Sequence, residues 1–197
     1  MKFQSEKTAI DTRQALTAKL VVENLIPNDK ILDYGCGTGR NIRYIKDNAK
    51  ENITIAGCDI MEQLYRNAEK HNKLREQDIC IFLADQVPEN EFDIVLNSHV
   101  LNVIADDEIK QSVVNNIYKT LKEGGHALIE VRTKKDVEGA KHKVPYGDGW
   151  HITKTNTYQE GITKEKMIEL VTNAGFTIEE HVFKSNVHYI IVQKLEF

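Results

Sequence analysis

An aspartate and three glycines in one short segment, Asp33-Tyr34-Gly35-Cys36-Gly37-Thr38-Gly39, have the types and spacing of a ligand-binding loop. Glycine adopts positive φ and lets another molecule approach the backbone closely. An apolar stretch precedes the segment and a polar run follows it, so it predicts a strand, a tight turn and a helix N-terminus that faces a ligand. A carboxylate at the end of the strand can pair with an ammonium group, whereas it would repel a pyrophosphate.

The glycine spacing argues against a dinucleotide site. The dinucleotide fingerprint is G-x-G-x-x-G, but here the third glycine, Gly39, comes one residue early and Arg40 takes the sixth position. The alternative for this segment alone is a tight turn in a flavodoxin-like or Rossmann sheet.

A second acid, Asp59, follows the next predicted strand, 53–58. An acid at this point can accept hydrogen bonds from two ribose hydroxyls. Ile60 and Met61 come directly after it. They either lie against the face of an adenine or belong to the core at the start of a helix.

Asp-x-Gly-x-Gly-x-Gly followed by this acid resembles the first motifs of class I S-adenosylmethionine-dependent methyltransferases. In that family the loop wraps the methionine part of the cofactor, and the first acid lies near its amino group. The resemblance implies S-adenosylmethionine as cofactor and S-adenosylhomocysteine as product. It implies cofactor contacts from Asp33, Gly35, Cys36, Gly37, Gly39, Asp59, Ile60 and Met61.

The same resemblance assigns roles after two further predicted strands. Asp85, which follows 79–83, is expected to accept from the adenine amine, and the next backbone N–H, that of Gln86, to reach the ring. A turn-forming Asp is the alternative. The strand 92–97 ends at Asn97, whose backbone carbonyl can face the cofactor's ammonium group.

His99 is the first candidate for a general base, because it follows this fourth strand at the point that faces the transferring methyl group. Imidazole changes charge near neutral pH, as proton transfer requires. His151 and Tyr146 are second candidates. A partly buried histidine with a structural partner is the alternative for His99. The other histidines considered are expected on outer elements and have no assigned role: His71, His142, His181 and His188.

Apolar periodicity predicts the elements that position these residues. The fold class is α/β, with a doubly wound, mostly parallel seven-stranded sheet, helices on both faces and an antiparallel C-terminal hairpin. The expected helices are 8–26, 40–50, 61–75, 106–122 and 163–174, and Glu123-Gly124-Gly125 is expected to end the fourth. The expected strands are 31–33, 53–58, 79–83, 92–97, 126–131, 177–183 and 187–194.

Residues 133–162 are too long for a plain connection and are expected to form a functional lid. Residues 132–143 carry a net charge of +3, and Tyr146 and Trp150 follow. This combination suits stacking on a base with phosphate contact, but the overall net charge of −4 disfavours nucleic acid. A solvated loop that Trp150 pins to the core is the alternative. The methyl acceptor therefore stays open between a small molecule and a nucleic acid.

Length and composition bound the remaining possibilities. The 197 residues, 41% hydrophobic and 28% charged, suit a single domain over 1–197. No apolar run is long enough to span a bilayer, so no membrane partner is expected. The three cysteines form no C-x-x-C pair and are expected to be reduced, mostly buried thiols of a cytoplasmic protein, without a metal. The oligomeric state is left open.

Several stretches within 7–174 are also similar to the DNA phosphorothioation-associated methyltransferase family. They include Lys7-Thr8-Ala9-Ile10, Val100-Leu101-Asn102-Val103-Ile104, Tyr146-Gly147-Asp148-Gly149 and Thr157-Tyr158-Gln159. The chain departs from that family in its short length, its lack of a companion domain and its Thr38-Gly39. This likeness implies a fold and a cofactor, but no substrate.

Three functions follow from these patterns. The first is a methyltransferase that acts by in-line displacement. The second is a non-catalytic S-adenosylmethionine-binding or sensor protein of a phage or defence system. The third is an NAD-dependent dehydrogenase, against which Gly39-Arg40 and the terminal hairpin both count.

Overall fold

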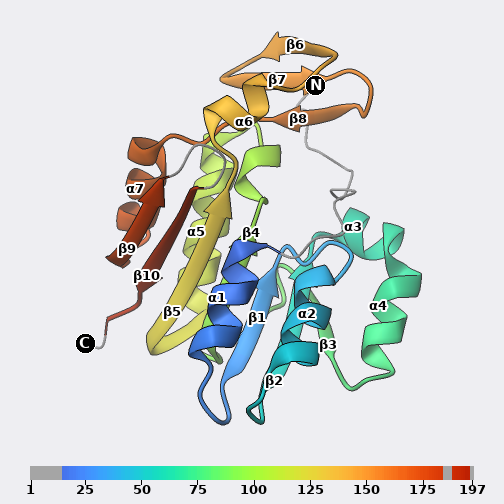
Figure 1. Ribbon diagram of the computed structural model, residues 1–197, viewed down its shortest axis with the longest axis vertical. Coiled ribbons are helices and arrows are strands. Elements are labelled where there is room, and N and C mark those ends of the chain that lie inside the picture. The colour runs from blue at the N-terminus through green and yellow to red at the C-terminus, as the bar shows by residue number, and fades with distance from the viewer. Residues whose placement is uncertain (1–14, 184–187, 196–197) are drawn as a thin grey trace.

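A seven-stranded sheet forms the centre of the computed structural model, which describes residues 15–183 and 188–195 (Figure 1). Its strands are β1 (Lys30–Tyr34), β2 (Thr54–Asp59), β3 (Cys80–Leu83), β4 (Phe92–Ser98), β5 (Leu121–Val131), β9 (Thr177–Phe183) and β10 (His188–Gln193). Their order is β3-β2-β1-β4-β5-β10-β9. The first five pair in parallel, and β10 is antiparallel to both neighbours. The predicted fold class is confirmed.

Helices cover both faces of this sheet. They are α1 (Leu16–Asn24), α2 (Arg40–Asn48), α3 (Met61–Arg66), α4 (Ala68–Arg75), α5 (Asp107–Thr120), α6 (Lys134–Glu138) and α7 (Lys164–Asn173), with a 3-10 turn η1 (Leu101–Val103). Residues of α5 and α7 form one apolar core with the sheet. Residues of α1, α2 and α4 form the core on the other face. Burial on two faces explains the consecutive apolar residues Ile31-Leu32 in β1 and Ile94-Val95-Leu96 in β4.

The predicted helix 61–75 is wrong in one respect, because it is two helices that meet at Asn67. Asn67 has φ −104° and ψ 16°, outside helical geometry. Its side-chain amide donates to the carbonyl of Gln63 at 3.1 Å. Asparagine competes with the helical backbone in this way, which makes it a common point of interruption.

The predicted end of helix 106–122 is also wrong. The helix ends at Thr120, and β5 begins at once with the fully buried Leu121. Gly124, at φ +76°, lies inside the strand and donates its N–H to the carbonyl of Lys194 at 2.7 Å. The glycines therefore shape an irregular start of β5 beside the end of β10 and do not terminate the helix.

Some predictions fall partly outside the described residues. Of the helix expected over 8–26, residues 8–14 are not described, and the described part is helical from Leu16 to Asn24. The hairpin turn 184–186 also lies outside. Of the three cysteines, Cys36 and Cys58 are buried as expected, whereas Cys80 is exposed.

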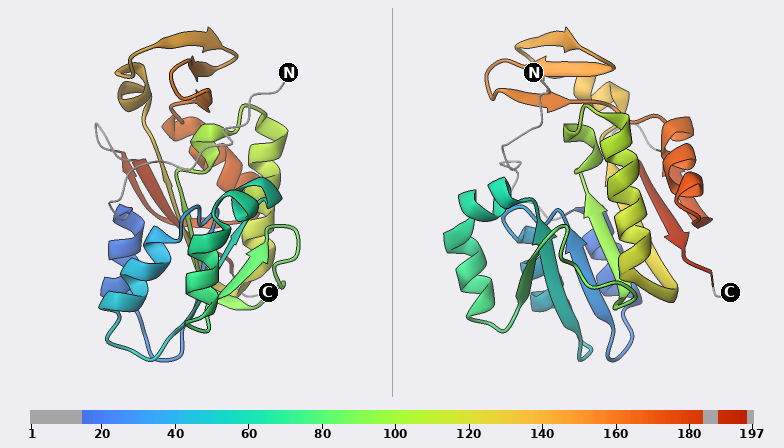
Figure 2. Two further views of the ribbon diagram at one scale, coloured as in Figure 1. Left: turned by 90° about the vertical axis from the view of Figure 1, so that its right-hand side faces the viewer. Right: turned by 180° about the vertical axis from the view of Figure 1, so that it is seen from behind.

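The segment 133–162 contains more regular structure than a loop. After α6 it forms a three-stranded antiparallel sheet in the order β6-β7-β8, from β6 (Lys143–Tyr146), β7 (Gly149–Ile152) and β8 (Thr157–Gln159). Figure 2 shows this small sheet at the end of the molecule toward which β4 and β5 point. Ligands of open α/β sheets bind at that end.

Within the described ranges, no helix combines the length and apolar character needed to cross a bilayer.

Candidate functional site

The glycine loop after β1 has the backbone that the sequence predicts. Gly35, Gly37 and Gly39 have φ of +83°, +53° and +75°. A β-carbon on Gly35 would lie 2.3 Å from a methyl of Val100, and one on Gly39 would lie 2.5 Å from a methyl of Leu74. Any other residue at these two positions would therefore be both strained and obstructed.

Asp33 is a buried carboxylate at the carboxyl end of β1. It is 1% exposed, and neither of its oxygens has a hydrogen-bond partner among the described residues. Burial raises the pKa of Asp33 to about 7, an effect that the nearby Asn41 side chain partly offsets. A buried carboxylate without a partner is costly. The position therefore fits a ligand that brings a cation, as the ammonium group of S-adenosylmethionine would.

Asn97 lies at the same edge, since Asp33 pairs with the preceding Leu96 across β1 and β4. The Asn97 amide donates to the carbonyl of Tyr34 at 2.9 Å. Its side-chain oxygen is buried and has no partner within the described ranges. Side-chain and backbone oxygens at this point add to the polarity around Asp33.

Asp59 ties the end of β2 to the glycine loop. One oxygen accepts from the Gly37 N–H at 2.7 Å, and the other accepts from the Ile60 N–H at 2.9 Å. Burial raises the pKa of Asp59 to about 6, although these two hydrogen bonds oppose the rise. A carboxylate offers about four acceptor positions. Two therefore remain for the hydroxyls of a ribose.

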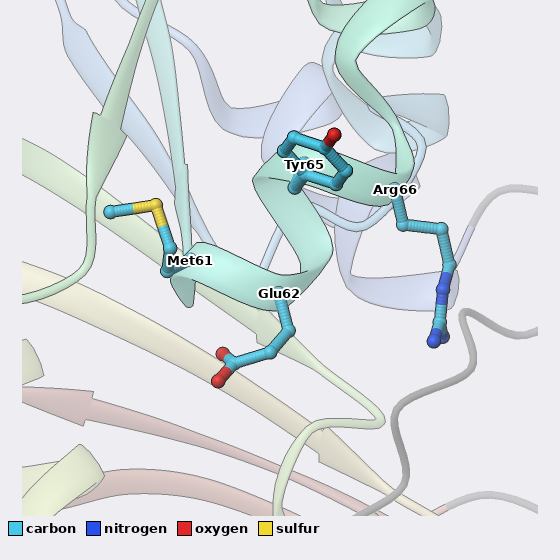
Figure 3. Close-up of a pocket in the computed structure, with 4 residues that line it drawn as sticks. All are labelled: Met61, Glu62, Tyr65 and Arg66. Carbon is cyan, nitrogen blue, oxygen red and sulfur yellow. The ribbon is translucent and has the colours of Figure 1, made fainter.

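Ile60 and Met61 are 42% and 60% exposed, so they do not belong to the core. Figure 3 shows Met61 with Glu62, Tyr65 and Arg66 on α3, around a surface pocket that these four residues line. Exposed apolar side chains beside Asp59 offer a surface for a flat aromatic ring.

Asp85 and Gln86 lie exposed in the turn after β3. The Gln86 N–H, which was expected to reach an adenine ring, donates to the carbonyl of Leu83 at 2.9 Å and closes this turn. Asp85 keeps a carboxylate at the expected edge of the sheet.

His99 follows β4 in a left-handed backbone conformation, with φ +61°. Its N–H donates to the carbonyl of Glu130 at 2.8 Å, and its Nε2 lies 3.4 Å from Oε1 of the same residue. The His99 side chain is 27% exposed, whereas that of Glu130 is 4% exposed. Glu130 is not among the residues predicted for the site, although a single acid inside the apolar strand 126–131 is a signal that could have identified it.

His151 and Tyr146 are held within the small sheet. Nε2 of His151 lies 2.8 Å from the side-chain oxygen of Asn156. Tyr146 packs edge-on against Tyr158, with 6.1 Å between the ring centres. These contacts are local to the insertion and do not join either residue to His99.

Two histidines expected on outer elements are fully buried. Nε2 of His71 lies 2.7 Å from the carbonyl of Gly37, so His71 supports the glycine loop from α4. His188 in β10 lies 2.6 Å from His181 through their Nε2 atoms and supports the terminal hairpin.

Asn102, in η1, fixes both ends of the insertion. Its side-chain oxygen accepts from the Arg132 N–H at 2.8 Å, and its amide donates to the carbonyl of Glu160 at 2.5 Å. The Glu160 N–H returns to the carbonyl of Asn102 at 2.8 Å. The entry and exit of the insertion are thus joined to the segment that follows β4.

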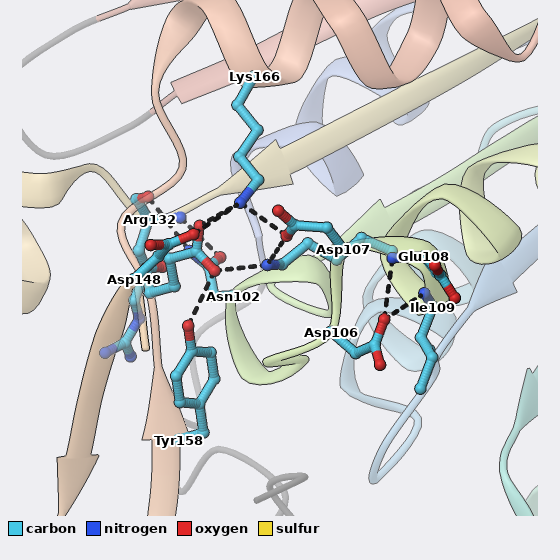
Figure 4. Close-up of polar contacts among 11 residues, drawn as sticks. Asn102, Asp106, Asp107, Glu108, Ile109, Arg132, Asp148, Tyr158 and Lys166 are labelled. Atoms are coloured by element: carbon cyan, nitrogen blue, oxygen red, sulfur yellow. Dashed lines mark hydrogen bonds and ion pairs between the residues drawn. The ribbon is translucent and has the colours of Figure 1, made fainter. Parts of the chain in front are cut away.

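Lys166, Tyr158 and Asp107, labelled in Figure 4, belong to a polar network whose centre is the buried Glu160 carboxylate. This carboxylate accepts from Lys110 Nζ at 2.5 Å, Lys166 Nζ at 2.8 Å and the Tyr158 hydroxyl at 2.9 Å. Asp107 lies 2.7 Å from both lysines. The network joins β8 to α5 and α7, and so fastens the small sheet to the main domain.

Comparison with known proteins agrees with this geometry. A model of the methyltransferase domain family matches residues 6–181. The carboxy-S-adenosyl-L-methionine synthase of Campylobacter fetus is 24% identical over 87% of this chain and 79% of that protein. Phosphoethanolamine N-methyltransferase 3 of Arabidopsis thaliana is 29% identical over 54% of this chain, but the match spans only 21% of that longer protein.

Solved structures share the fold. The PH0226 protein of Pyrococcus horikoshii has a TM-score of 0.72 at 17% identity, covering 89% of this chain and 86% of that one. A SAM-dependent methyltransferase of Methanosarcina mazei has a TM-score of 0.67 at 18% identity, covering 89% and 97%. The family match over most of the chain, together with the sheet order and the Asp33 loop, leads to one conclusion: the chain belongs to the methyltransferase domain family, with a class I fold and S-adenosylmethionine as its cofactor.

Proposed function

We propose that this protein transfers a methyl group from S-adenosylmethionine to a small-molecule acceptor by in-line displacement. The observation that carries the proposal is the buried, unpartnered Asp33 carboxylate beside three glycines with positive φ. A catalytic role is favoured over a non-catalytic sensor, because the named relatives are themselves a synthase and methyltransferases.

Each group of residues has a separate task in this proposal. Asp33 and Asn97 hold the ammonium end of the cofactor, and Asp59 accepts from its ribose. Ile60 and Met61 cover the adenine, and Asp85 accepts a hydrogen bond from the adenine amine. When bound, the cofactor supplies a methyl group on a positively charged sulfur that is already an activated leaving group. The chain therefore contributes mainly the alignment of the methyl acceptor. His99 receives the proton that the acceptor loses.

The insertion 133–162 is proposed as a lid over the acceptor. Its two ends are fixed through Asn102, and the Glu160 network fastens β8 to α5 and α7, so its motion would be confined to β6 and β7. Lys143 Nζ lies 4.3 Å above the Trp150 ring and occupies a face on which a base would stack. This contact and the net charge of −4 favour a small molecule over a nucleic acid.

The cellular setting is also part of the proposal. Cys36 and Cys58 are buried free thiols, as suits a reducing cytoplasm. The likeness to DNA phosphorothioation-associated methyltransferases rests on the sequence stretches alone. We keep it as a proposal for the context in which the enzyme works.

Transfer of a labelled methyl group tests the activity. The protein is incubated with methyl-labelled cofactor and, separately, with DNA, RNA, protein and a metabolite extract. Label is expected in the metabolite pool. Label confined to DNA or RNA would overturn the small-molecule acceptor, and cofactor binding without label in any pool would support the sensor instead.

Cofactor affinity is expected to rise with pH between 5.5 and 8. The ammonium group needs Asp33 as a carboxylate, but the pKa of Asp33 in the free protein is about 7 and that of Asp59 about 6. Below these values a proton must leave before the ligand binds, so affinity should fall by about tenfold per pH unit for each group. Calorimetry over this range measures the slope. Asp33→Asn should remove the step near pH 7, whereas the exposed Asp47→Asn should not, and a flat wild-type profile would contradict the role of Asp33.

A further inference from the structure

The Glu130 side chain connects α1, β5 and the residue after β4 at the carboxyl edge of the sheet. Glu130 lies in β5, between the fully buried Ile129 and Val131, and pairs with Ser98 of β4. It reaches Thr17 of α1 in one direction and His99 in the other. An acid in such an apolar setting is retained at a cost unless its charge is paired.

The two oxygens of Glu130 serve different partners. Oε2 accepts from the N–H and the hydroxyl of Thr17, at 2.9 and 3.0 Å. Oε1 lies 3.4 Å from Nε2 of His99. Burial alone would raise the pKa of Glu130, but the contacts with His99 and Thr17 outweigh it and hold the pKa below its usual value. Glu130 therefore remains charged beside the imidazole.

His99 is held at two points by this one residue. The backbone bond from its N–H to the Glu130 carbonyl fixes the left-handed turn, and the carboxylate faces Nε2 of the ring. A side chain other than glycine is strained in this backbone conformation. Nδ1, the other ring nitrogen, is buried in this structure and has no hydrogen-bond partner among the described residues, so an acceptor reaches it only when the groups that cover it move aside. Nε2 of the ring therefore faces a carboxylate, whereas Nδ1 has no hydrogen-bond partner within the described ranges.

We propose that Glu130 is a positioning residue that keeps the Nε2–H of His99 toward its carboxylate and leaves Nδ1 to accept a proton, and that the methyl acceptor is accordingly a small-molecule hydroxyl. The inference rests on the proposed function. A hydroxyl is a weak nucleophile until its proton leaves, so it gains most from a held base. A thiolate or a neutral amine already presents a free electron pair.

The hydroxyl oxygen forms a bond to the methyl carbon as the carbon–sulfur bond breaks, and that electron pair stays on sulfur. The hydroxyl proton moves to Nδ1 of His99. The adjacent Glu130 carboxylate stabilises the resulting imidazolium without itself taking a proton.

The alternative role for Glu130 is to hold α1 against the sheet, because Thr17 of α1 donates hydrogen bonds to the same carboxylate. A titration of the ligand-free protein separates the two roles. The carboxyl carbon of Glu130 is followed by NMR from pH 2.5 to 7 in the wild type, in His99→Gln and in Thr17→Val. If Glu130 is paired with His99, its pKa rises in His99→Gln. An unchanged titration in His99→Gln, with a rise only in Thr17→Val, would overturn the positioning role whether or not the protein is an enzyme.

The identity of the product tests the hydroxyl class. With carbon-13 methyl-labelled cofactor and a metabolite extract, the chemical shift of the transferred methyl distinguishes O-methyl from N-methyl and S-methyl products. An O-methyl product is expected, with a kcat about 10²-fold lower in Glu130→Gln at unchanged KM and partial recovery in Glu130→Asp. An N-methyl or S-methyl product would overturn the acceptor class. Absence of any methylated product would instead overturn the proposed function, while the NMR titration still decides the pairing of Glu130 with His99.

Discussion

Replacement of His99 by alanine is expected to lower turnover by about 10²–10⁴-fold and to leave the affinity for S-adenosylmethionine nearly unchanged. The expectation follows from the separation of tasks at the carboxyl edge. Asp33 and Asp59 lie at the carboxyl ends of β1 and β2, whereas His99 follows β4 and lies against Glu130. A higher pH should partly restore the variant, because a more ionised acceptor needs less help from a base.

A second histidine provides a matched control for this substitution. His126 precedes Glu130 within β5, and its Nε2 lies 3.2 Å from Oε2 of Glu179, so His126→Ala also breaks a histidine–glutamate pair. It should leave turnover unchanged, since His126 pairs with Gln193, the last residue of β10, away from the carboxyl end of β5 where Glu130 lies. A joint fall of melting temperature and cofactor affinity in His99→Ala would indicate a structural histidine. Normal turnover in a stable His99→Ala protein would remove His99 from the mechanism and direct attention to His151.

Replacement of Glu160 by glutamine is expected to lower the free energy of unfolding by about 3 kcal/mol, the lower end of the range for breaking a buried ion pair. Lys110 is fully buried, and Glu160 provides its buried counter-charge at 2.5 Å. Asp107 stays 2.7 Å from Lys110 and keeps the loss toward the smaller value. Urea unfolding measures the change.

Glu138→Gln is the control within the same insertion. Glu138 is half exposed and lies 3.9 Å from Lys134, an ion pair of the surface type. Its loss should change the unfolding free energy by less than about 1 kcal/mol. Equal effects of the two substitutions would show that the Glu160 network does not fasten the insertion.

The main sheet could be predicted from the sequence because each of its strands has a recognisable local sequence pattern. Buried parallel strands contain short apolar runs, and an acid stands next to last in β1 (Asp33) and last in β2 (Asp59). The glycine loop needs positive φ at three positions, a conformation that glycine adopts without strain. Local chemistry of this kind does not depend on distant partners.

The remainder depends on distant contacts that composition does not reveal. The strands β6 to β8 have three or four residues each, too few for a period to stand out from a loop. In the sequence, Glu130 is simply one residue of a strand. Its partners Thr17 and His99 are 113 and 31 positions away, and only the fold places them beside it. Asn102 likewise gains its role only because the two ends of the insertion meet at η1.

Titration calorimetry with S-adenosylmethionine, S-adenosylhomocysteine and NAD tests the central claim most directly. The protein is expected to bind the two adenosyl ligands and not NAD. Asp59→Ala should weaken that binding by roughly 1.5–3 kcal/mol, because it removes a charged acceptor for the ribose, with circular dichroism confirming that the variant is folded. Tight binding of NAD without a signal from S-adenosylmethionine, or normal binding by a folded Asp59→Ala protein, would contradict the account.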